Sequence, residues 1–163
     1  MDKSMKNGLA KKILFKLVQV DRLHRNILDY KLKEFNIYRS QHQLLRYLLG
    51  VNILPSQKEI AQKLDITAAA VATTIKKMEK EGLVKKTPSK QDNRINLINI
   101  TAEGRRIMFQ TRQMFDLSDQ DVIQGISNED LDIALKVLSK MEDNLIEMGA
   151  VDRAADFYKV KDD

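Results

Sequence analysis

Three consecutive polar residues, Asp92, Asn93 and Arg94, lie near the end of the polar loop in the segment TPSKQDNRINLINIT. The loop leads into an apolar run, which is typical of the tip of a β-hairpin. An arginine at such a tip can enter a DNA groove, and the Asp92 carboxylate can accept its hydrogen bond and fix the direction of the guanidinium. Lys90 would add a phosphate contact. The alternative is an exposed ion pair that contributes under about 1 kcal/mol to stability.

The residues before this loop predict two short helices joined by a tight turn. Ser56 and Glu59 form a capping box for the first helix, in SQKEIAQKLDI, and Thr67 caps the second helix. After Gly82 the pattern changes to the β-type runs LVKKT and INLINI. A hairpin directly behind a helix-turn-helix is a wing. The second helix buries apolar residues at helical spacing, namely Val71, Ile75 and Met78.

The first turn of the second helix carries only small side chains, so it can approach a DNA major groove closely. Its free backbone N–H groups and the positive end of the helix dipole suit a phosphate. The residues of this end are Thr67, Ala68, Ala69 and Ala70. The outward face beyond them should carry Ala72, Thr73 and Lys76, with Lys77 at its edge.

Alanine cannot donate a hydrogen bond to a base edge, but alanine and threonine methyl groups can contact the methyl group of thymine. Together with an arginine in a narrow minor groove, this predicts an AT-rich DNA site. The alternative for the alanines is that they only favour helix formation. Further contacts are expected from Ser56 and Gln57 at the start of the first helix, and from Lys85 or Lys86 on the first wing strand.

Composition and charge narrow the class of protein. Residues 1–112 hold 23 of the 28 basic side chains and only 10 of the 23 acidic ones, so this part of the chain suits a polyanion. Cysteine is absent, which removes disulfides, thiol catalysis and thiol sensing, and the two histidines form no metal-binding cluster. No phosphate-binding glycine loop or catalytic triad is present, and no long apolar run. We therefore expect a cytoplasmic protein that is not an enzyme and has no cofactor or metal.

Long amphipathic helices are predicted on both sides of the winged segment. The first covers about residues 9–32, with an apolar stripe wider than a monomer core requires, so a partner chain would bury the excess. Ser40 and Gln43 form a capping box for a helix whose buried stripe is Leu44, Leu45, Leu48 and Leu49. Thr101 caps a helix to about Ile123, and Ser127 with Asp130 caps the last one, residues 131–148. The fold class is mainly α with a small β-hairpin wing.

Four pieces of the chain, in this order and spacing, resemble the MarR family of bacterial transcription regulators. They are SQKEIAQKLDI, MEKEGLVKK, the wing-tip DNR and ITAEGRR, and the similarity spans roughly residues 9–148. The chain departs from the family at Ala72 and Thr73, where many members carry polar or basic groups. The resemblance implies a homodimer on double-stranded DNA, with a pseudo-palindromic operator.

The resemblance also implies how the chain is organised. Residues 1–36 would form an N-terminal dimerisation helix, 37–100 the winged helix-turn-helix region, and 101–163 the C-terminal dimerisation helices and acidic tail, all in one continuous domain. A repressor of this kind releases DNA when a small molecule enters a cleft beneath the dimer layer, for which Phe15, His24, Arg46 and Tyr47 are weak candidates. A winged-helix protein–protein interaction module without specific DNA binding is the alternative.

Overall fold

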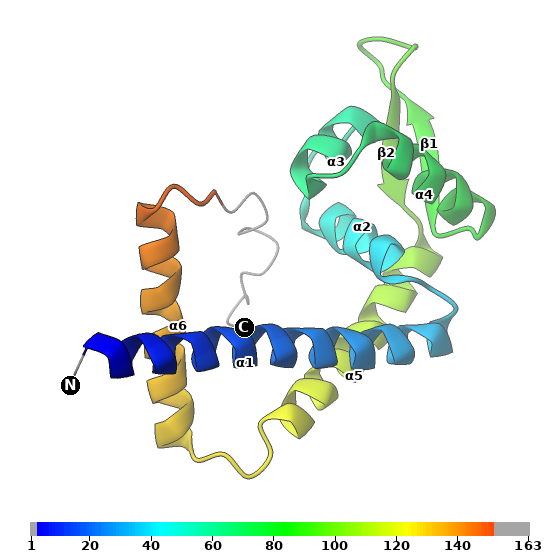
Figure 1. The fold of residues 1–163 in the computed structure, drawn as a ribbon. Coiled ribbons are helices and arrows are strands. Elements are labelled where there is room, and N and C mark those ends of the chain that lie inside the picture. Colours follow the sequence, from blue (N-terminus) through cyan, green and yellow to red (C-terminus); the bar gives the residue numbers. More distant parts are fainter. Residues whose placement is uncertain (1–2, 152–163) are drawn as a thin grey trace. The chain divides into compact units, whose positions relative to one another are not determined.

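The computed structural model describes residues 3–151, and the chain divides into two compact units between Arg39 and Ser40. The first unit contains helix α1 (Lys3–Leu32) and a short 3-10 helix, η1 (Lys33–Phe35). Helix α2 (Arg39–Gly50) begins at the last residue of the first unit, and the rest of it belongs to the second unit. The second unit continues with α3 (Gln57–Leu64), α4 (Ala68–Lys80), β1 (Val84–Pro88), β2 (Asn96–Ile100), α5 (Ala102–Val122) and α6 (Asn128–Glu147) (Figure 1). The predicted fold class, mainly α with a β-hairpin wing, is confirmed.

In the first unit, α1 ends in a turn that its own residues stabilise. Asn36 adopts the left-handed conformation and its backbone N–H donates to the Lys33 carbonyl oxygen, which ends η1. Arg39 binds back to α1, because its Nε donates to the Asp29 carboxylate at 2.9 Å and its second guanidinium nitrogen donates to the Arg25 carbonyl oxygen at 2.6 Å. These contacts hold the chain after α1 in a defined turn.

The core of the second unit contains buried side chains from α2, α3, α4, the hairpin and α5. Helical spacing on each helix and the alternation of the strands place these side chains on the inner faces. They are Leu44, Leu45, Leu48, Ile60, Val71, Ile75, Met78, Leu83, Val84, Ile98, Ile100, Ile107 and Met108. Helices α3 and α4 therefore share one core with the wing.

The wing is a two-stranded antiparallel sheet in which Val84 lies opposite Ile100 and Pro88 lies opposite Asn96. The start of α3 binds the second edge of β2. The Ile98 backbone N–H donates to the Pro55 carbonyl oxygen at 2.9 Å, and Ser56 forms an isolated bridge with Leu97. The wing is thereby attached to the helix-turn-helix by backbone hydrogen bonds.

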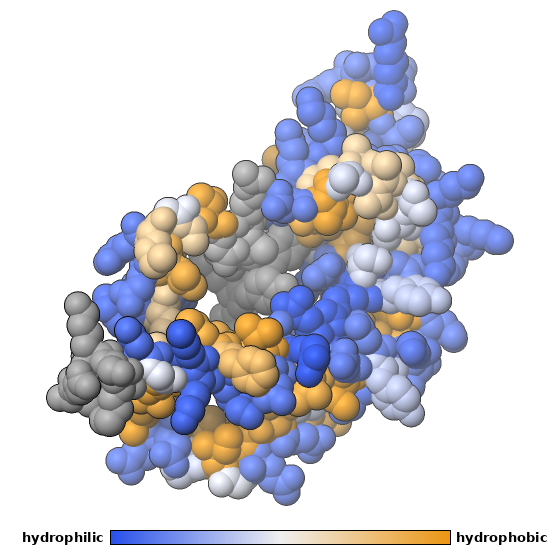
Figure 2. All heavy atoms as spheres, viewed as in Figure 1, coloured by the Kyte–Doolittle hydropathy of each residue, from blue (hydrophilic) through white to orange (hydrophobic). Residues whose placement is uncertain are grey.

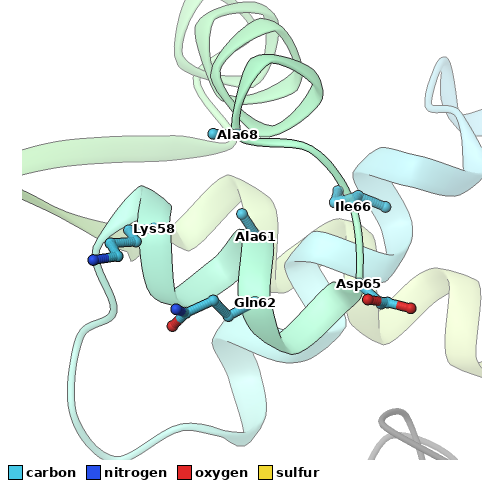
Figure 3. Close-up of a pocket in the computed structure, with 6 residues that line it drawn as sticks. All are labelled: Lys58, Ala61, Gln62, Asp65, Ile66 and Ala68. Atoms are coloured by element: carbon cyan, nitrogen blue, oxygen red, sulfur yellow. The ribbon is translucent and has the colours of Figure 1, made fainter.

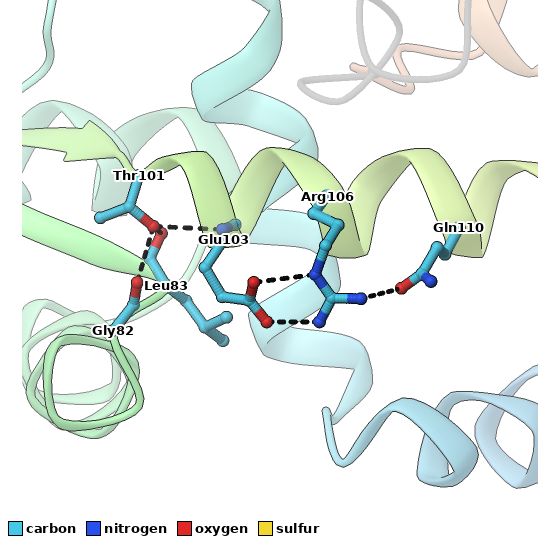
Figure 4. Close-up of polar contacts among 7 residues, drawn as sticks. Gly82, Leu83, Thr101, Glu103, Arg106 and Gln110 are labelled. Carbon is cyan, nitrogen blue, oxygen red and sulfur yellow. Dashed lines mark hydrogen bonds and ion pairs between the residues drawn. The ribbon is translucent and has the colours of Figure 1, made fainter.

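The beginning of α5 packs against the corner that joins α4 to β1. The Thr101 hydroxyl donates to the Gly82 carbonyl oxygen at 2.6 Å and accepts from the Gly104 backbone N–H at 3.1 Å (Figure 4). A Cβ atom on Gly104 would lie 2.4 Å from the Leu83 carbonyl oxygen, so only glycine permits this approach. On the outer face, Arg106 binds Glu103 and Gln110. The segment ITAEGRR is therefore a structural joint.

Two predictions about α2 are wrong in detail. The helix begins at Arg39, so Ser40 lies inside it and is not its capping residue. The helical backbone already includes Arg39, whose side chain is bound to Asp29 and Arg25 of α1. Leu49 is 41% exposed, because the inner face of α2 is filled by Leu44, Leu45 and Leu48.

The caps predicted for the other helices are confirmed. Ser127 accepts a hydrogen bond from the Asp130 backbone N–H at 3.1 Å, and Thr101 caps α5. Gly125, at φ 80°, lies in the turn between α5 and α6. The last acidic residues, 152–163, lie outside the described residues. No helix within residues 3–151 combines the length and the apolar character that crossing a membrane requires.

Candidate nucleic-acid interface

Helix α4 has one buried and one exposed face, as its sequence predicts. Val71, Ile75 and Met78 are fully buried, which turns the opposite side of the helix to solvent. All the predicted contact residues on this helix are exposed: Ala68, Ala69, Ala70, Ala72, Thr73, Lys76 and Lys77. The structure thus brings them together on one surface.

The N-terminal turn of α4 is capped by Thr67, whose side-chain oxygen accepts from the Ala70 backbone N–H at 3.2 Å. The N–H groups of Ala68 and Ala69 precede the first helical hydrogen bond and are directed out of the helix end. The Thr73 hydroxyl donates to the Ala69 carbonyl oxygen at 2.9 Å. Its proton is therefore used within the helix, and Thr73 offers an acceptor oxygen and a methyl group outward.

Helix α3 begins with the predicted capping box. The Glu59 carboxylate accepts from the Ser56 backbone N–H and hydroxyl, both at 2.7 Å, and these bonds lower the pKa of Glu59. The Ser56 hydroxyl oxygen accepts from the Glu59 backbone N–H. Ser56 is thus a structural cap whose hydroxyl proton is already used, and Gln57 beside it is half-buried.

The wing loop is held by hydrogen bonds between its own residues. The Ser89 backbone N–H donates to the Ile95 carbonyl oxygen at 2.8 Å, and the Ile95 N–H donates to the Asp92 carbonyl oxygen at 2.9 Å. The buried Ser89 hydroxyl oxygen accepts from the Gln91 backbone N–H at 3.2 Å. A short loop closed in this way presents its remaining side chains to solvent.

The role predicted for Asp92 needs correction. Its carboxylate accepts from the backbone N–H of Arg94 at 2.9 Å, which shapes the turn; it does not aim the guanidinium. A carboxylate two residues before an N–H readily closes such a turn, and the loop's other backbone bonds favour that geometry. Within residues 3–151 the Arg94 guanidinium has no hydrogen bond or ion pair, and the exposed Lys90 and Asn93 lie on the same loop.

The two lysines of β1 differ in their surroundings. Lys86 binds the Glu79 carboxylate of α4 at 2.8 Å, which joins the wing to α4. Lys85 is exposed and has no ion pair among the described residues, so it is the one available to a phosphate. Lys77 lies 3.8 Å from Glu81, an exposed pair of little energetic weight.

An open hollow lies between α3 and the start of α4 (Figure 3). Ala61 and Ala68 face it, and their small side chains leave space between the two helices. Its other lining residues are Lys58, Gln62, Asp65 and Ile66. Within the described part of the chain, no group of three or more acidic or histidine side chains is placed to hold a metal ion.

The four candidates for an effector cleft are divided between the two units. Phe15 and His24 lie on α1, and Phe15 is exposed. Arg46 and Tyr47 lie on α2, where burial is the main cause that raises the pKa of Tyr47.

The sequence did not reveal two buried polar contacts that α2 makes with the end of α4 and with α5. Gln41 is 2% exposed and its side-chain amide donates to the Glu81 carboxylate, and the neighbouring His42 is buried against α5. A glutamine and a histidine on the buried stripe of α2 were the only local signal, since their partners lie 40 and 69 residues away.

The chain is similar to known transcription regulators both in sequence and in fold. The MarR family profile matches residues 35–95. A mutant of MepR from S. aureus has a TM-score of 0.73 and 25% identity, over 82% of this chain and 97% of that chain. The S. aureus MepR–DNA complex has a TM-score of 0.61 and 25% identity, over 81% of this chain and 94% of that chain. MepR is a transcription regulator of the multidrug efflux pump MepA.

A mutant of MarR from E. coli shares the fold, with a TM-score of 0.69 and 19% identity over 78% of this chain and 95% of that chain. The pieces that carry the family resemblance in the sequence lie on α3, at the end of α4 and in β1, at the wing tip, and at the start of α5. Residues 35–95 thus match the MarR family profile, and the chain has the winged helix-turn-helix fold of these regulators.

Proposed function

We propose that the chain is a homodimeric, sequence-specific DNA-binding transcription regulator, and that it acts as a repressor. The observation that carries the proposal is the guanidinium of Arg94, which has no partner within residues 3–151 and lies on a loop closed by its own hydrogen bonds. The same unit exposes the outer face of α4. A regulator of similar fold has been solved with DNA. The pairing of an exposed helix with a wing arginine suits simultaneous contact with a major and a minor groove.

The proposed operator is a pseudo-palindromic, AT-rich duplex. The exposed face of α4 offers alanine methyl groups and the Thr73 methyl group, with the Thr73 hydroxyl proton used inside the helix. Methyl groups on the protein match the thymine methyl in the major groove. Arg94 matches the negative potential of a narrow A·T minor groove. Lys76, Lys85 and Lys90 would add contacts to phosphate.

The proposed dimer would bury apolar surface that one chain leaves open. Eight apolar residues of α1, from Leu9 to Ile27, are between 41% and 66% exposed. Helix α6 buries no residue, and Leu135, Leu138 and Leu145 are each at least 45% exposed. Figure 2 shows apolar side chains in orange at the surface of both helices. A second copy of the chain is the partner that suits them.

Fluorescence anisotropy tests the proposal, with DNA from the intergenic region upstream of the protein's own gene and an unrelated duplex of equal length. We expect the upstream duplex to bind at least about a thousandfold more tightly, with affinity falling steeply as salt rises. A small-molecule effector would then be found by release of the same probe.

Equal and weak binding to both duplexes would contradict sequence-specific recognition of this region. The alternative function, a protein–protein interaction module, would then gain support from the lack of hydrogen-bonding side chains at Ala68, Ala69 and Ala72.

A further inference from the structure

Two consecutive polar residues on the inner face of α2 hold two different helices. Gln41 is 2% exposed, and its Nε2 donates to the Glu81 carboxylate at 2.5 Å. Glu81 is the residue at which α4 ends. His42 is 6% exposed, and its Nε2 lies 3.1 Å from the Thr111 hydroxyl oxygen of α5. The start of α2 therefore binds the end of α4, the proposed recognition helix for DNA, and the middle of α5.

The contact of His42 lies on the buried side of α5. The Thr111 hydroxyl oxygen, 3.1 Å from His42 Nε2, also lies 3.0 and 3.2 Å from the carbonyl oxygens of Ile107 and Met108. The ring also meets Phe115 edge-on, with 4.7 Å between the ring centroids and 80° between the planes. Two side chains one turn apart on α5 thus hold the imidazole in place.

A third connection joins the end of α4 directly to the start of α5. The corner after α4 is bound to the start of α5, because the Thr101 hydroxyl donates to the Gly82 carbonyl oxygen (Figure 4) and the Thr101 backbone N–H donates to the Leu83 carbonyl oxygen. The absence of a side chain at Gly104 lets the Leu83 carbonyl approach α5 closely. Helix α2, the end of α4 and the first half of α5 therefore form a closed ring of contacts.

We propose that Gln41 is a positioning residue for the recognition helix, holding α4 at a defined angle to α5 through Glu81. The inference rests on the proposed DNA-binding function. Gln41 is too buried to touch DNA, so its effect on DNA binding must be indirect, and its hydrogen bond to Glu81 connects it to α4. Helix α4 has 13 residues and is about 20 Å long, so a small rotation at Glu81 displaces its DNA-contacting end. Major-groove readout depends on the placement of that end.

The other contact of Glu81 does not provide this restraint. Lys77 lies on α4 itself, one turn before Glu81 and 3.8 Å away, so the pair cannot fix α4 against another helix. The pair between Lys86 and Glu79 connects α4 to the wing and not to α2. Of these contacts at the end of α4, only that of Gln41 comes from α2.

A charge exchange tests the proposal. Gln41→Glu places two carboxylates against each other, and we expect it to weaken specific DNA binding about tenfold. The slope of affinity against salt should not change, since no phosphate contact is lost. The double variant Gln41→Glu/Glu81→Gln rebuilds the hydrogen bond with donor and acceptor reversed, and should restore wild-type affinity.

Gln43→Glu is the matched control, because it makes the same chemical change at an exposed position two residues along α2. It should bind DNA as the wild type does. Gln41→Met, which removes the bond without adding charge, replaces Gln41→Glu if that variant does not fold, and should weaken binding by a smaller factor. Circular dichroism establishes that each variant is folded at the temperature of the titration.

A distance measurement tests the same residue without DNA. The chain has no cysteine, so Lys80→Cys and Gln113→Cys give spin labels only at these exposed positions of α4 and α5. Double electron–electron resonance in an excess of unlabelled protein should give one narrow distance distribution within a chain. Gln41→Glu should shift or broaden that distribution, and the double variant should restore it.

An unchanged distance distribution in folded Gln41→Glu protein would overturn the positioning role, as would failure of the double variant to restore it. If the wild type binds no DNA duplex specifically, the proposed function fails. The spin-label result then still decides whether Gln41 sets the angle of α4.

Discussion

The carboxylate of Asp92 accepts a hydrogen bond from the backbone N–H of Arg94 at 2.9 Å and so shapes the wing tip. The Arg94 guanidinium has no partner among the described residues. Asp92 therefore influences the Arg94 side chain only through the backbone: its carboxylate defines the turn, and the turn directs Arg94 towards solvent.

This geometry predicts different results for two substitutions of Asp92. Asparagine retains a side-chain oxygen that can accept the same hydrogen bond, so Asp92→Asn should bind DNA as tightly as the wild type, or slightly more tightly because a negative charge is lost. Asp92→Ala removes the acceptor and should weaken binding several-fold. Anisotropy titrations measure both. If Asp92→Asn were as weak as Asp92→Ala, an ion pair with the guanidinium would be the correct role.

Arg94→Ala should weaken binding at least tenfold without loss of stability, because the exposed guanidinium has no hydrogen bond or ion pair to lose within the described part of the chain. The thermal unfolding temperature should stay within a degree or two of the wild type. Lys136→Ala, on the exposed surface of α6, is the control and should leave affinity unchanged. Wild-type affinity in the Arg94 variant would exclude the wing tip from the interface.

Gly104→Ala should destabilise the fold by about 3 kcal/mol, because the added Cβ would meet the Leu83 carbonyl oxygen and the Ile100 side chain at 2.4 and 2.8 Å. Urea unfolding followed by circular dichroism gives the free energy. Gly50→Ala is the matched control, since a Cβ there meets nothing within 4 Å. A decrease of less than about 1 kcal/mol in the free energy of unfolding would show that the Leu83 carbonyl and the Ile100 side chain can move aside at little cost.

The buried His42 predicts a loss of stability in mild acid. Burial, with the nearby positive charge of Arg46, lowers the pKa of His42 from 6.5 to about 4. Between these values the unfolded chain binds a proton that the folded chain excludes. The free energy of unfolding is therefore unaffected by protonation of His42 above pH 6.5, and it decreases as the pH falls from 6.5 towards 4. The whole loss is about 3 kcal/mol.

The measurement is the free energy of unfolding by urea from pH 7 to pH 4. His42→Gln, which can still bind Thr111 but does not titrate, separates this effect from the carboxylates that also protonate in acid. The difference between the two curves should change by about 3 kcal/mol over the range. Parallel curves would mean that His42 is protonated in the folded protein.

Leu138→Glu should dissociate the proposed dimer, because it places a charge on an apolar side chain of α6 that is 45% exposed in one chain. Sedimentation velocity measures the oligomeric state. Ser139→Glu, on the next residue of the same helix, should leave the dimer intact. Equal sedimentation of the wild type and both variants would place Leu138 outside any interface.

Much of the secondary structure follows from residues within four positions of one another. The capping box of Ser56 and Glu59, the Thr67 and Thr101 caps and the change of period after Gly82 are local, so their helices and strands could be predicted. The outward face of α4 followed from its buried stripe. Ser40 shows the limit of such reasoning, because the capping pattern of Ser40 and Gln43 predicted a start at Ser40, whereas α2 begins at Arg39, whose side chain binds Asp29 ten residues earlier.

The sequence alone determined the fold class, helices α3 and α4, the wing and the residues of α4 that face outward. Hydrophobic periodicity and capping depend only on residues close to one another in the sequence, so they could be recognised without the structure. Only the tertiary structure decided that Asp92 binds a backbone N–H, that Gly104 must admit a carbonyl, and that Gln41 reaches Glu81. These contacts depend on loop conformation and on segments up to 40 residues apart. Their geometry exists only after the core has packed.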